Sequence, residues 1–181
     1  MQRISGFLFA GLILIAAPTV TRAGVMTGFD AMTSTVFEEG QSSFSGIGLR
    51  AHLHPASLVP QVEFLPTFEY WRNSSTVQPY NIQAIRKDAT LGVDARYVFT
   101  KPTWKPYLGA GFAIHFLSNK VNAPAFGLND ASTSVTKGGL AALAGASFPL
   151  TGRIETFVDL KYHHITDYRQ LKLSWGLAFG L

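Results

Sequence analysis

The last twelve residues of the chain alternate between large apolar and small or polar side chains up to the final residue. Successive side chains of a β-strand point to opposite faces, so one face of this segment carries Leu171, Leu173, Trp175, Leu177, Phe179 and Leu181. A soluble sandwich strand can show the same alternation, but soluble domains seldom end on such a stripe because their termini fray into water. A membrane-spanning β-strand needs about 9–11 residues with this pattern. The segment therefore predicts the closing strand of a β-barrel in a membrane.

The composition supports the same interpretation. Hydrophobic residues make up 47% of the 181 residues and charged residues only 14%, whereas soluble domains carry about 25% charged residues. The chain has no cysteine, which excludes disulfides and thiolate metal sites. The formal charge of +4 includes Arg3 and Arg22, and no run of Lys or Arg is present. The sequence therefore gives no indication of nucleic-acid binding.

The first 23 residues have the layout of a secretory signal peptide. Arg3 supplies the positive charge, an apolar run extends from Gly6 to Ala17, and the segment ends on the small residue Ala23. The run is too short for a spanning helix, and no later stretch is apolar enough for one. The alternative is an uncleaved amphipathic anchor. We expect residues 1–23 to be a signal peptide and residues 24–181 to be one barrel domain.

The spacing of the alternating segments predicts how many strands the barrel has. Seven segments are clear and an earlier one, at residues 24–37, is weak; the clear ones are 44–54, 59–71, 88–99, 106–117, 137–148, 154–164 and 170–181. Short connections near Pro55, Pro102 and Pro149 alternate with long ones at 72–87 and 118–136. Outer-membrane barrels have short periplasmic turns, longer external loops and periplasmic termini. With both termini periplasmic the number of strands must be even, so the weak segment at 24–37 is needed as the first strand. The sequence therefore predicts an all-β, eight-stranded antiparallel transmembrane barrel in an up-and-down meander.

Charged residues fall on the inner face of the predicted strands. An outward charge at mid-bilayer costs roughly 2–4 kcal/mol for Arg or Lys, whereas a soluble barrel would place its charges outside. An eight-stranded barrel is just wide enough for side chains to fill it, so we expect a lumen filled by paired charges. A narrow passive channel for ions or small solutes is the alternative. The predicted lumen network comprises Arg50, Glu63, Glu69, Asp88, Asp94, Arg96, Glu155, Asp159, Lys161 and Lys172.

Aromatic residues gather near the ends of the predicted strands, as in the girdles of membrane proteins. We expect Tyr70, Trp71, Phe116 and Tyr162 at the loop end and Tyr97, Phe99, Trp104 and Phe148 at the turn end. Pro66 lies inside a strand and removes one backbone donor, which predicts a β-bulge there.

Three stretches resemble the small outer-membrane β-barrel family, the OmpA/OmpX-like porin-family proteins. They are Pro106-Tyr-Leu-Gly-Ala-Gly-Phe-Ala, Gly145-Ala-Ser-Phe-Pro-Leu-Thr-Gly-Arg-Ile and Asp167-Tyr-Arg-Gln-Leu-Lys-Leu-Ser-Trp-Gly-Leu-Ala-Phe. The resemblance covers roughly residues 40–181 and is architectural. It implies assembly by the barrel-assembly machinery, which in this family reads a C-terminal aromatic residue; here Phe179 stands two residues before Leu181.

The expected function is a structural or surface-interaction role in the outer membrane of a Gram-negative cell. Outer-membrane lipid is one expected partner. An extracellular ligand or host surface is another, with loops 72–87 and 118–136 as the contact surface. No cofactor is expected.

Catalysis and metal binding are the remaining alternatives. Lipid A deacylases of the PagL type carry a His-x-Ser pair on a late strand, and His164-Ile-Thr166 is similar with Thr in place of Ser. The segment 170–181 contains no Asp or Glu to orient the histidine, so we expect no catalytic site. His52 and His54 share a strand face and could bind a metal with His115 or His163, but we expect no metal site.

Overall fold

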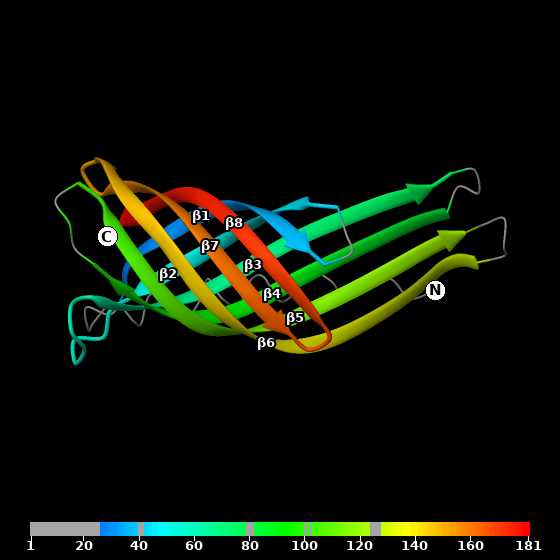
Figure 1. Ribbon diagram of the computed structural model, residues 1–181, viewed down its shortest axis with the longest axis horizontal. Coiled ribbons are helices and arrows are strands. Elements are labelled where there is room, and N and C mark those ends of the chain that lie inside the picture. Colours follow the sequence, from blue (N-terminus) through cyan, green and yellow to red (C-terminus); the bar gives the residue numbers. More distant parts are fainter. Residues whose placement is uncertain (1–25, 40–41, 79–81, 100, 102, 124–127) are drawn as a thin grey trace.

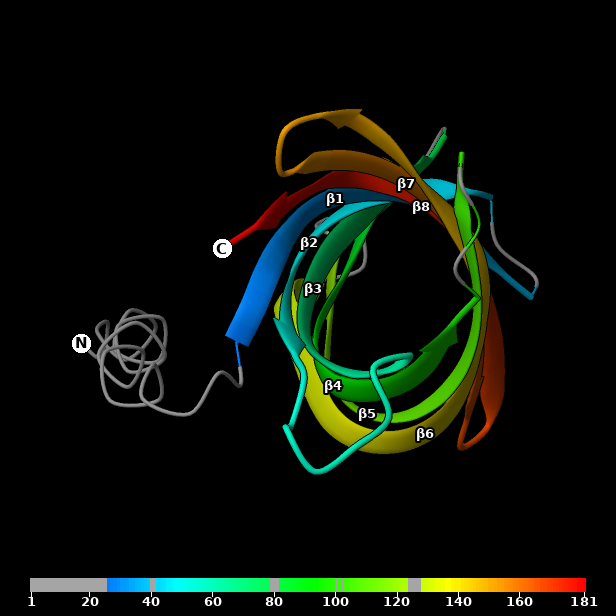
Figure 2. The same cartoon turned by 90° about the vertical axis from the view of Figure 1, so that its left-hand side faces the viewer.

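The computed structural model describes residues 26–39, 42–78, 82–99, 101, 103–123 and 128–181. The predicted signal peptide at 1–23 therefore lies outside the described residues. Eight strands form one closed barrel in which each strand pairs antiparallel with its neighbour in sequence and β8 pairs with β1 (Figures 1 and 2). The predicted fold class is confirmed. The strands are β1 (Met26–Glu38), β2 (Phe44–Leu53), β3 (Val62–Val77), β4 (Ile82–Val98), β5 (Lys105–Ala123), β6 (Leu128–Thr151), β7 (Ile154–Ile165) and β8 (Tyr168–Gly180).

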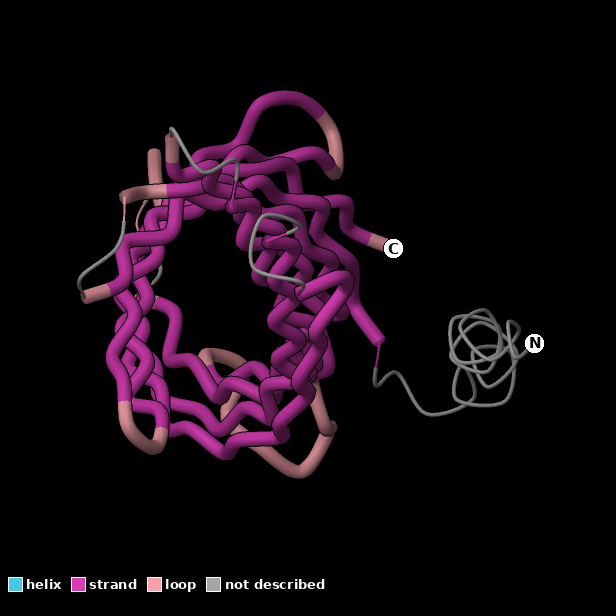
Figure 3. Tube along the Cα trace, turned by 90° about the vertical axis from the view of Figure 1, so that its right-hand side faces the viewer, coloured by secondary structure: helices cyan, strands magenta, loops and turns pink. Residues whose placement is uncertain are grey.

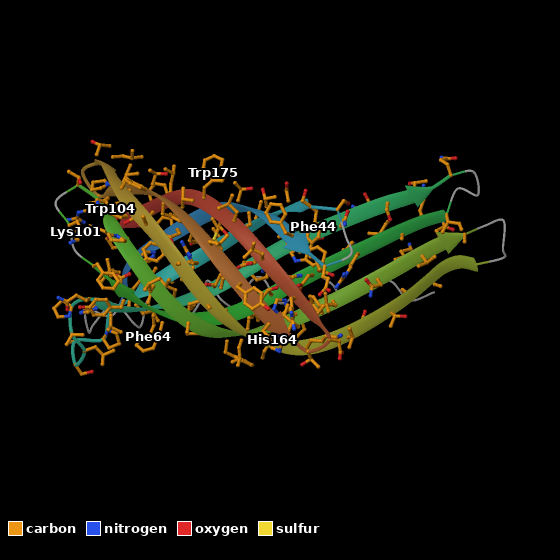
Figure 4. All side chains as sticks on the ribbon, viewed as in Figure 1. Phe44, Phe64, Lys101, Trp104, His164 and Trp175 are labelled. Atoms are coloured by element: carbon orange, nitrogen blue, oxygen red, sulfur yellow. The ribbon has the colours of Figure 1, made fainter. Side chains whose placement is uncertain are left out.

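The barrel is apolar outside and polar inside. Leu140 and Trp175 are 65% and 60% exposed on the outer surface, where Trp175 projects away from the barrel (Figure 4). Asp88 and Lys172, by contrast, are fully buried. Strand alternation sends these two classes to opposite faces. A surface of this kind is stable against hydrocarbon, while buried charges persist only where they are paired.

The barrel closes between the weakest predicted strand and the clearest one. β1 pairs with β8 continuously, from Gly28 opposite Gly180 to Glu38 opposite Gln170. Inside the barrel the hydroxyls of Ser34 and Ser174 lie 2.9 Å apart across this seam. Alternation in β1 is hard to see in the sequence because its outward face mixes Thr33 and Thr35 with the larger Phe37.

The two predicted long loops are mostly strand, so that part of the prediction is wrong. β3 and β4 remain paired up to Val77 opposite Ile82, and β5 and β6 up to Ala123 opposite Leu128. These four strands extend well past the other strand ends (right side of Figure 1). Backbone pairing continues in water without an apolar face, because the ladder satisfies its own donors and acceptors. The polar composition at 72–87 and 118–136 therefore marked the end of the lipid contact, not the end of the strands.

The predicted bulge at Pro66 is also absent. Arg50 pairs with Thr67 and Leu53 pairs with Phe64, three residues further along each strand, so the β2–β3 register is unchanged past the proline. Pairing with β4 is likewise continuous, with Pro66 opposite Val93. Pro66 has no backbone N–H, and strand pairing is interrupted next to it only on the β2 side.

The β6–β7 and β7–β8 hairpins turn tightly. Gly152, with φ of 55°, begins the two-residue connection from β6 to β7, and Asp167, with φ of 76°, ends the connection from β7 to β8. Viewed from the end that carries the long strands, the described strands form a closed ring (Figure 3). No helix among the described residues is long and apolar enough to cross a membrane.

The β1–β8 seam generates the first prediction. A Cβ at Gly176 would lie 2.1 Å from the Ala31 carbonyl oxygen, whereas one at Gly138 would approach nothing closer than a Phe112 ring carbon at 3.5 Å. Overpacking of this kind costs about 1–3 kcal/mol. We expect Gly176→Ala to lower the temperature at which the barrel loses its unboiled mobility on an SDS gel, and Gly138→Ala to leave it nearly unchanged. Equal midpoints for the two variants would contradict the close approach at the seam.

Candidate functional site

Arg50 on β2 joins three strands through the barrel interior. Its Nε lies 2.8 Å from Asp30 Oδ2 on β1, and its Nη1 lies 2.6 Å from Asp159 Oδ2 on β7. The guanidinium also stands 4.4 Å from the centroid of the Phe157 ring. Charge-assisted hydrogen bonds of this kind are the strong ones, and the planar fork of Arg suits two carboxylates. Strands that are not neighbours are therefore cross-linked.

Two lysines share one glutamate next to this group. Lys161 Nζ lies 2.6 Å from Asp94 Oδ2 and 3.6 Å from Glu69 Oε1. Lys172 on β8 forms a hydrogen-bonded ion pair with the other oxygen of Glu69, on β3. All four side chains are at most 7% exposed. At this level the interior is occupied by two lysines and two carboxylates that neutralise one another.

The turn end of the interior is more open. Arg96 donates to Glu63 Oε2 at 2.7 and 2.9 Å, and its guanidinium lies 4.6 Å from the Tyr107 ring centroid. Glu155 pairs with Lys105 and accepts a 2.8 Å hydrogen bond from Ser147. A cavity of about 340 Å³ lies among these side chains.

The hairpin end of the interior contains an apolar cluster and a histidine pair. Phe44 and Trp71, with ring centroids 4.3 Å apart, pack with Val36 and Leu117. Beside them Asp88 Oδ2 lies 2.8 Å from His115 Nδ1, and His115 Nε2 lies 3.2 Å from His163 Nδ1. Glu38 forms an ion pair with Arg86 and accepts a 2.9 Å hydrogen bond from Gln170. Aromatic and aliphatic bulk thus separates the charged interior from the outer rim.

The structure brings the ten predicted lumen residues together inside the barrel. Eight are buried, while Glu63 and Glu155 are partly exposed at the turn end. Sequence reasoning missed Asp30, Glu38, Arg86, Lys105 and Gln170, which complete these pairs. The signal for Asp30 and Glu38 was present, since both alternate against the outward Thr and Phe of β1. Arg86 lay in a segment interpreted as loop.

Trp71 is a wrong assignment among the predicted girdle aromatics. It is 2% exposed and lies inside the barrel, because it follows the outward Tyr70 and strand neighbours point to opposite faces. The other predicted girdle residues are exposed on the outer surface: Tyr70, Tyr97, Phe99, Trp104, Phe116, Phe148 and Tyr162. At the turn end the rings of Trp104 and Phe148 stack with centroids 6.4 Å apart, and Figure 4 places Trp104 at that end.

Comparison with known families decides what kind of barrel this is. A family model described as Opacity family porin protein matches residues 65–181, from β3 to the C-terminal residue. The chain belongs to this family. The Opacity-family fold and its relatives make the protein an integral β-barrel of the outer membrane. Comparison with curated protein sequences gives no significant match.

Solved structures share the fold at low sequence identity. Neisserial surface protein A is 20% identical with a TM-score of 0.63, covering 87% of this chain and 97% of its own. Ail of Yersinia pestis, in complex with the heparin analogue sucrose octasulfate, is 15% identical with a TM-score of 0.60, covering 86% and 97%. A major outer membrane protein of Thermus thermophilus is 12% identical with a TM-score of 0.62, covering 86% and 99%.

His164 and Thr166, the pair considered for a hydrolase, are exposed at the end of β7 and in the β7–β8 turn. His164 is exposed on the outer surface, and among the described residues no carboxylate contacts it. The Thr166 hydroxyl lies 3.5 Å from the Gly138 carbonyl oxygen, to which it donates a hydrogen bond. A nucleophile requires a base that a third group orients.

The histidines considered as metal ligands are also separated. His52 contacts Asp30, and His54 donates to the Val62 carbonyl oxygen at 2.9 Å, whereas His115 and His163 lie beside Asp88. Within the described ranges, no three His, Cys, Asp or Glu side chains are arranged to hold a metal ion.

The Arg50 cluster generates the second prediction. Removing one partner of a buried ion pair typically costs about 3–5 kcal/mol, because the other charge stays buried without compensation. We expect Arg50→Met to lower the free energy of unfolding by about that amount, and Arg50→Met combined with Asp159→Asn to recover part of it. Urea unfolding in lipid vesicles, followed by tryptophan fluorescence, measures both.

Lys101→Met removes an exposed cation at the turn end and serves as the matched control. An Arg50→Met barrel as stable as this control would show that the cluster contributes nothing to stability.

Proposed function

We propose that this protein acts at the cell surface, where its tall hairpins contact an extracellular ligand or a host surface. The tall hairpins are residues 72–77 with 82–87 and residues 118–123 with 128–136, which lie beyond the aromatic residues Tyr70 and Phe116. The observation that carries the proposal is their projection past the ends of β1, β2, β7 and β8 (Figure 1). A barrel that served only as a membrane anchor would have no use for this extra length.

The tall hairpins form one sheet and not two separate loops. β4 pairs with β5 from Gln83 opposite Asn122 to Lys87 opposite Ser118, which joins the two hairpins side by side. The result is a four-stranded sheet outside the membrane. Such a platform loses little conformational entropy when a partner binds, because its backbone is already ordered.

This external sheet also has two free edges. The last β2–β3 pair is Gly46 with Trp71, and the last β6–β7 pair is Gly139 with Ile165. Among the described residues, the outer part of β3 therefore has no strand on its β2 side, and the outer part of β6 has none on its β7 side. Unpaired edges present backbone donors and acceptors that can take up an extended segment of another chain. Exposed Asn, Ser and Thr side chains lie on the faces, together with the exposed Val121 and Val135.

The similar structures support a surface role without specifying a partner. One is named a surface protein and another an attachment invasion locus protein. The structural fold is shared, and the external hairpins are where an Opacity-family barrel can meet a ligand.

The surface role predicts that hairpin length is required for adhesion. Asn73 is opposite Arg86, and Asn119 is opposite Thr133, so Asn-Gly can replace residues 74–85 and residues 120–132 as two-residue hairpin turns. We expect cells of a non-adherent strain that display the full chain to attach to cultured epithelial cells, and the doubly shortened chain to lose most of this attachment. Unboiled SDS gels show whether each barrel has folded. Equal attachment by folded full-length and shortened barrels would refute the proposal.

The filled interior predicts the absence of a useful pore. The Arg50 and Glu69 clusters occupy the middle of the barrel, and Phe44 with Trp71 closes the hairpin end. We expect a planar bilayer containing the folded protein to show no conductance steps above the lipid background. Stable steps that scale with the amount of protein would instead favour a narrow channel.

A further inference from the structure

We propose that the outer face at the base of the tall hairpins binds the phosphate group of an outer-leaflet lipid, through Arg72 and Lys87. Ser118 and Ser134 would donate hydrogen bonds beside them. The site lies on the outward face at the base of the tall hairpins, and it is therefore separate from the hairpin tips proposed above to meet an extracellular partner.

The four residues lie in one row across four strands. Arg72 on β3 is opposite Lys87 on β4, Lys87 is opposite Ser118 on β5, and Ser118 is opposite Ser134 on β6. Adjacent strands are about 4.8 Å apart, so Ser134 lies about 14 Å from Arg72 across the row. One phosphate group in the middle of the row is within reach of the long Arg72 and Lys87 side chains from one side and of the serines from the other.

The neighbouring residues show that the basic pair points outward. Trp71 and Asp88, which adjoin Arg72 and Lys87 in sequence, are 2% and 0% exposed inside the barrel. Arg72 and Lys87 are exposed, as strand alternation requires.

The row lies at the depth of lipid headgroups. The next outward-facing row towards the membrane contains Tyr70, Ala89 and Phe116, which are paired across β3, β4 and β5. Two residues of strand correspond to a rise of about 7 Å, so the basic row stands just beyond the loop-end aromatic residues. Below it the apolar face continues with Ile114 and Phe112, against which acyl chains can lie.

The electrostatics of the row are unfavourable without an anion. Like charges directly opposite each other destabilise a strand pair. Neither Arg72 nor Lys87 forms an ion pair with the described residues, and the nearest carboxylate in sequence, Asp88, points inside towards His115. A phosphate between the two cations would turn repulsion into attraction, and serine hydroxyls suit its remaining oxygens.

A lipid fits this position better than a soluble anion. Basic residues next to the membrane surface attract anionic headgroups, and the apolar strand face below the row can hold the attached chains. A soluble anion would gain only the first of these contributions.

The test is a binding titration on the full chain folded in zwitterionic micelles. Bisphosphorylated lipid A is added, and the thermal midpoint is followed by tryptophan fluorescence. We expect lipid A to raise the midpoint of the wild type, and Arg72→Gln with Lys87→Gln to weaken apparent binding at least tenfold. Lys101→Gln with Arg153→Gln removes two cations at the turn end and should bind like the wild type.

Further arms separate the sources of the phosphate and guard against misfolding. Dephosphorylated lipid A and inorganic phosphate alone should leave the midpoint within about 1 °C of the lipid-free value. Each single variant, Arg72→Gln or Lys87→Gln, should weaken binding at least threefold, and Arg72→Lys with Lys87→Arg should retain it. Equal binding by the Arg72→Gln/Lys87→Gln variant and the wild type would overturn the proposal. An equal response to inorganic phosphate would overturn the assignment to a lipid.

Discussion

The pairing of β1 with β8 is the contact on which the whole barrel depends. Hydrocarbon offers no water to hydrogen-bond a free sheet edge, so only a closed sheet can cross a bilayer with strands. The continuous register from Gly28–Gly180 to Glu38–Gln170 removes that edge. Closure also fixes which side chains are inside, and so determines where every charge must find its partner.

Inside the closed sheet, ion pairs occupy the space that apolar side chains fill in a soluble protein. Arg50 ties β2 to β1 and β7, Lys172 ties β8 to β3, and Gln170 ties β8 to Glu38 on β1. Some of these contacts reach across the interior between strands that share no backbone hydrogen bonds. Two small apolar clusters, one around Trp71 and one around Leu65, complete the filling.

The sequence predicted the architecture well because lipid imposes a strict alternation on residues that contact it. The inward charges followed from that rule, and the strand number and directions followed from it together with the alternation of short and long connections. Asp30 and Glu38 were missed because Thr on the outer face of β1 weakened the alternation. Trp71 was misplaced because aromatic character was given more weight than its position next to Tyr70.

The external part of the strands was least predictable, for a physical reason. Beyond the lipid both faces of a strand meet water, so no face is selected to be apolar and the period-2 pattern disappears. Pairing nevertheless continues, because backbone complementarity between antiparallel neighbours does not depend on the side chains. Pro66 shows the same independence, since the register is unchanged despite one missing donor.

The unequal strand lengths give the barrel a mouth that is cut obliquely. β3–β6 form a high wall on one side, whereas β7 and β8 turn at Thr166–Asp167 and β1 ends at Glu38 (Figure 1). Near the mouth the Lys137 ammonium lies 5.4 Å from the Tyr168 ring centroid, and both side chains are half-buried. Approach to this protein is therefore directional in the plane of the membrane, so its neighbours in the same bilayer meet two different sides.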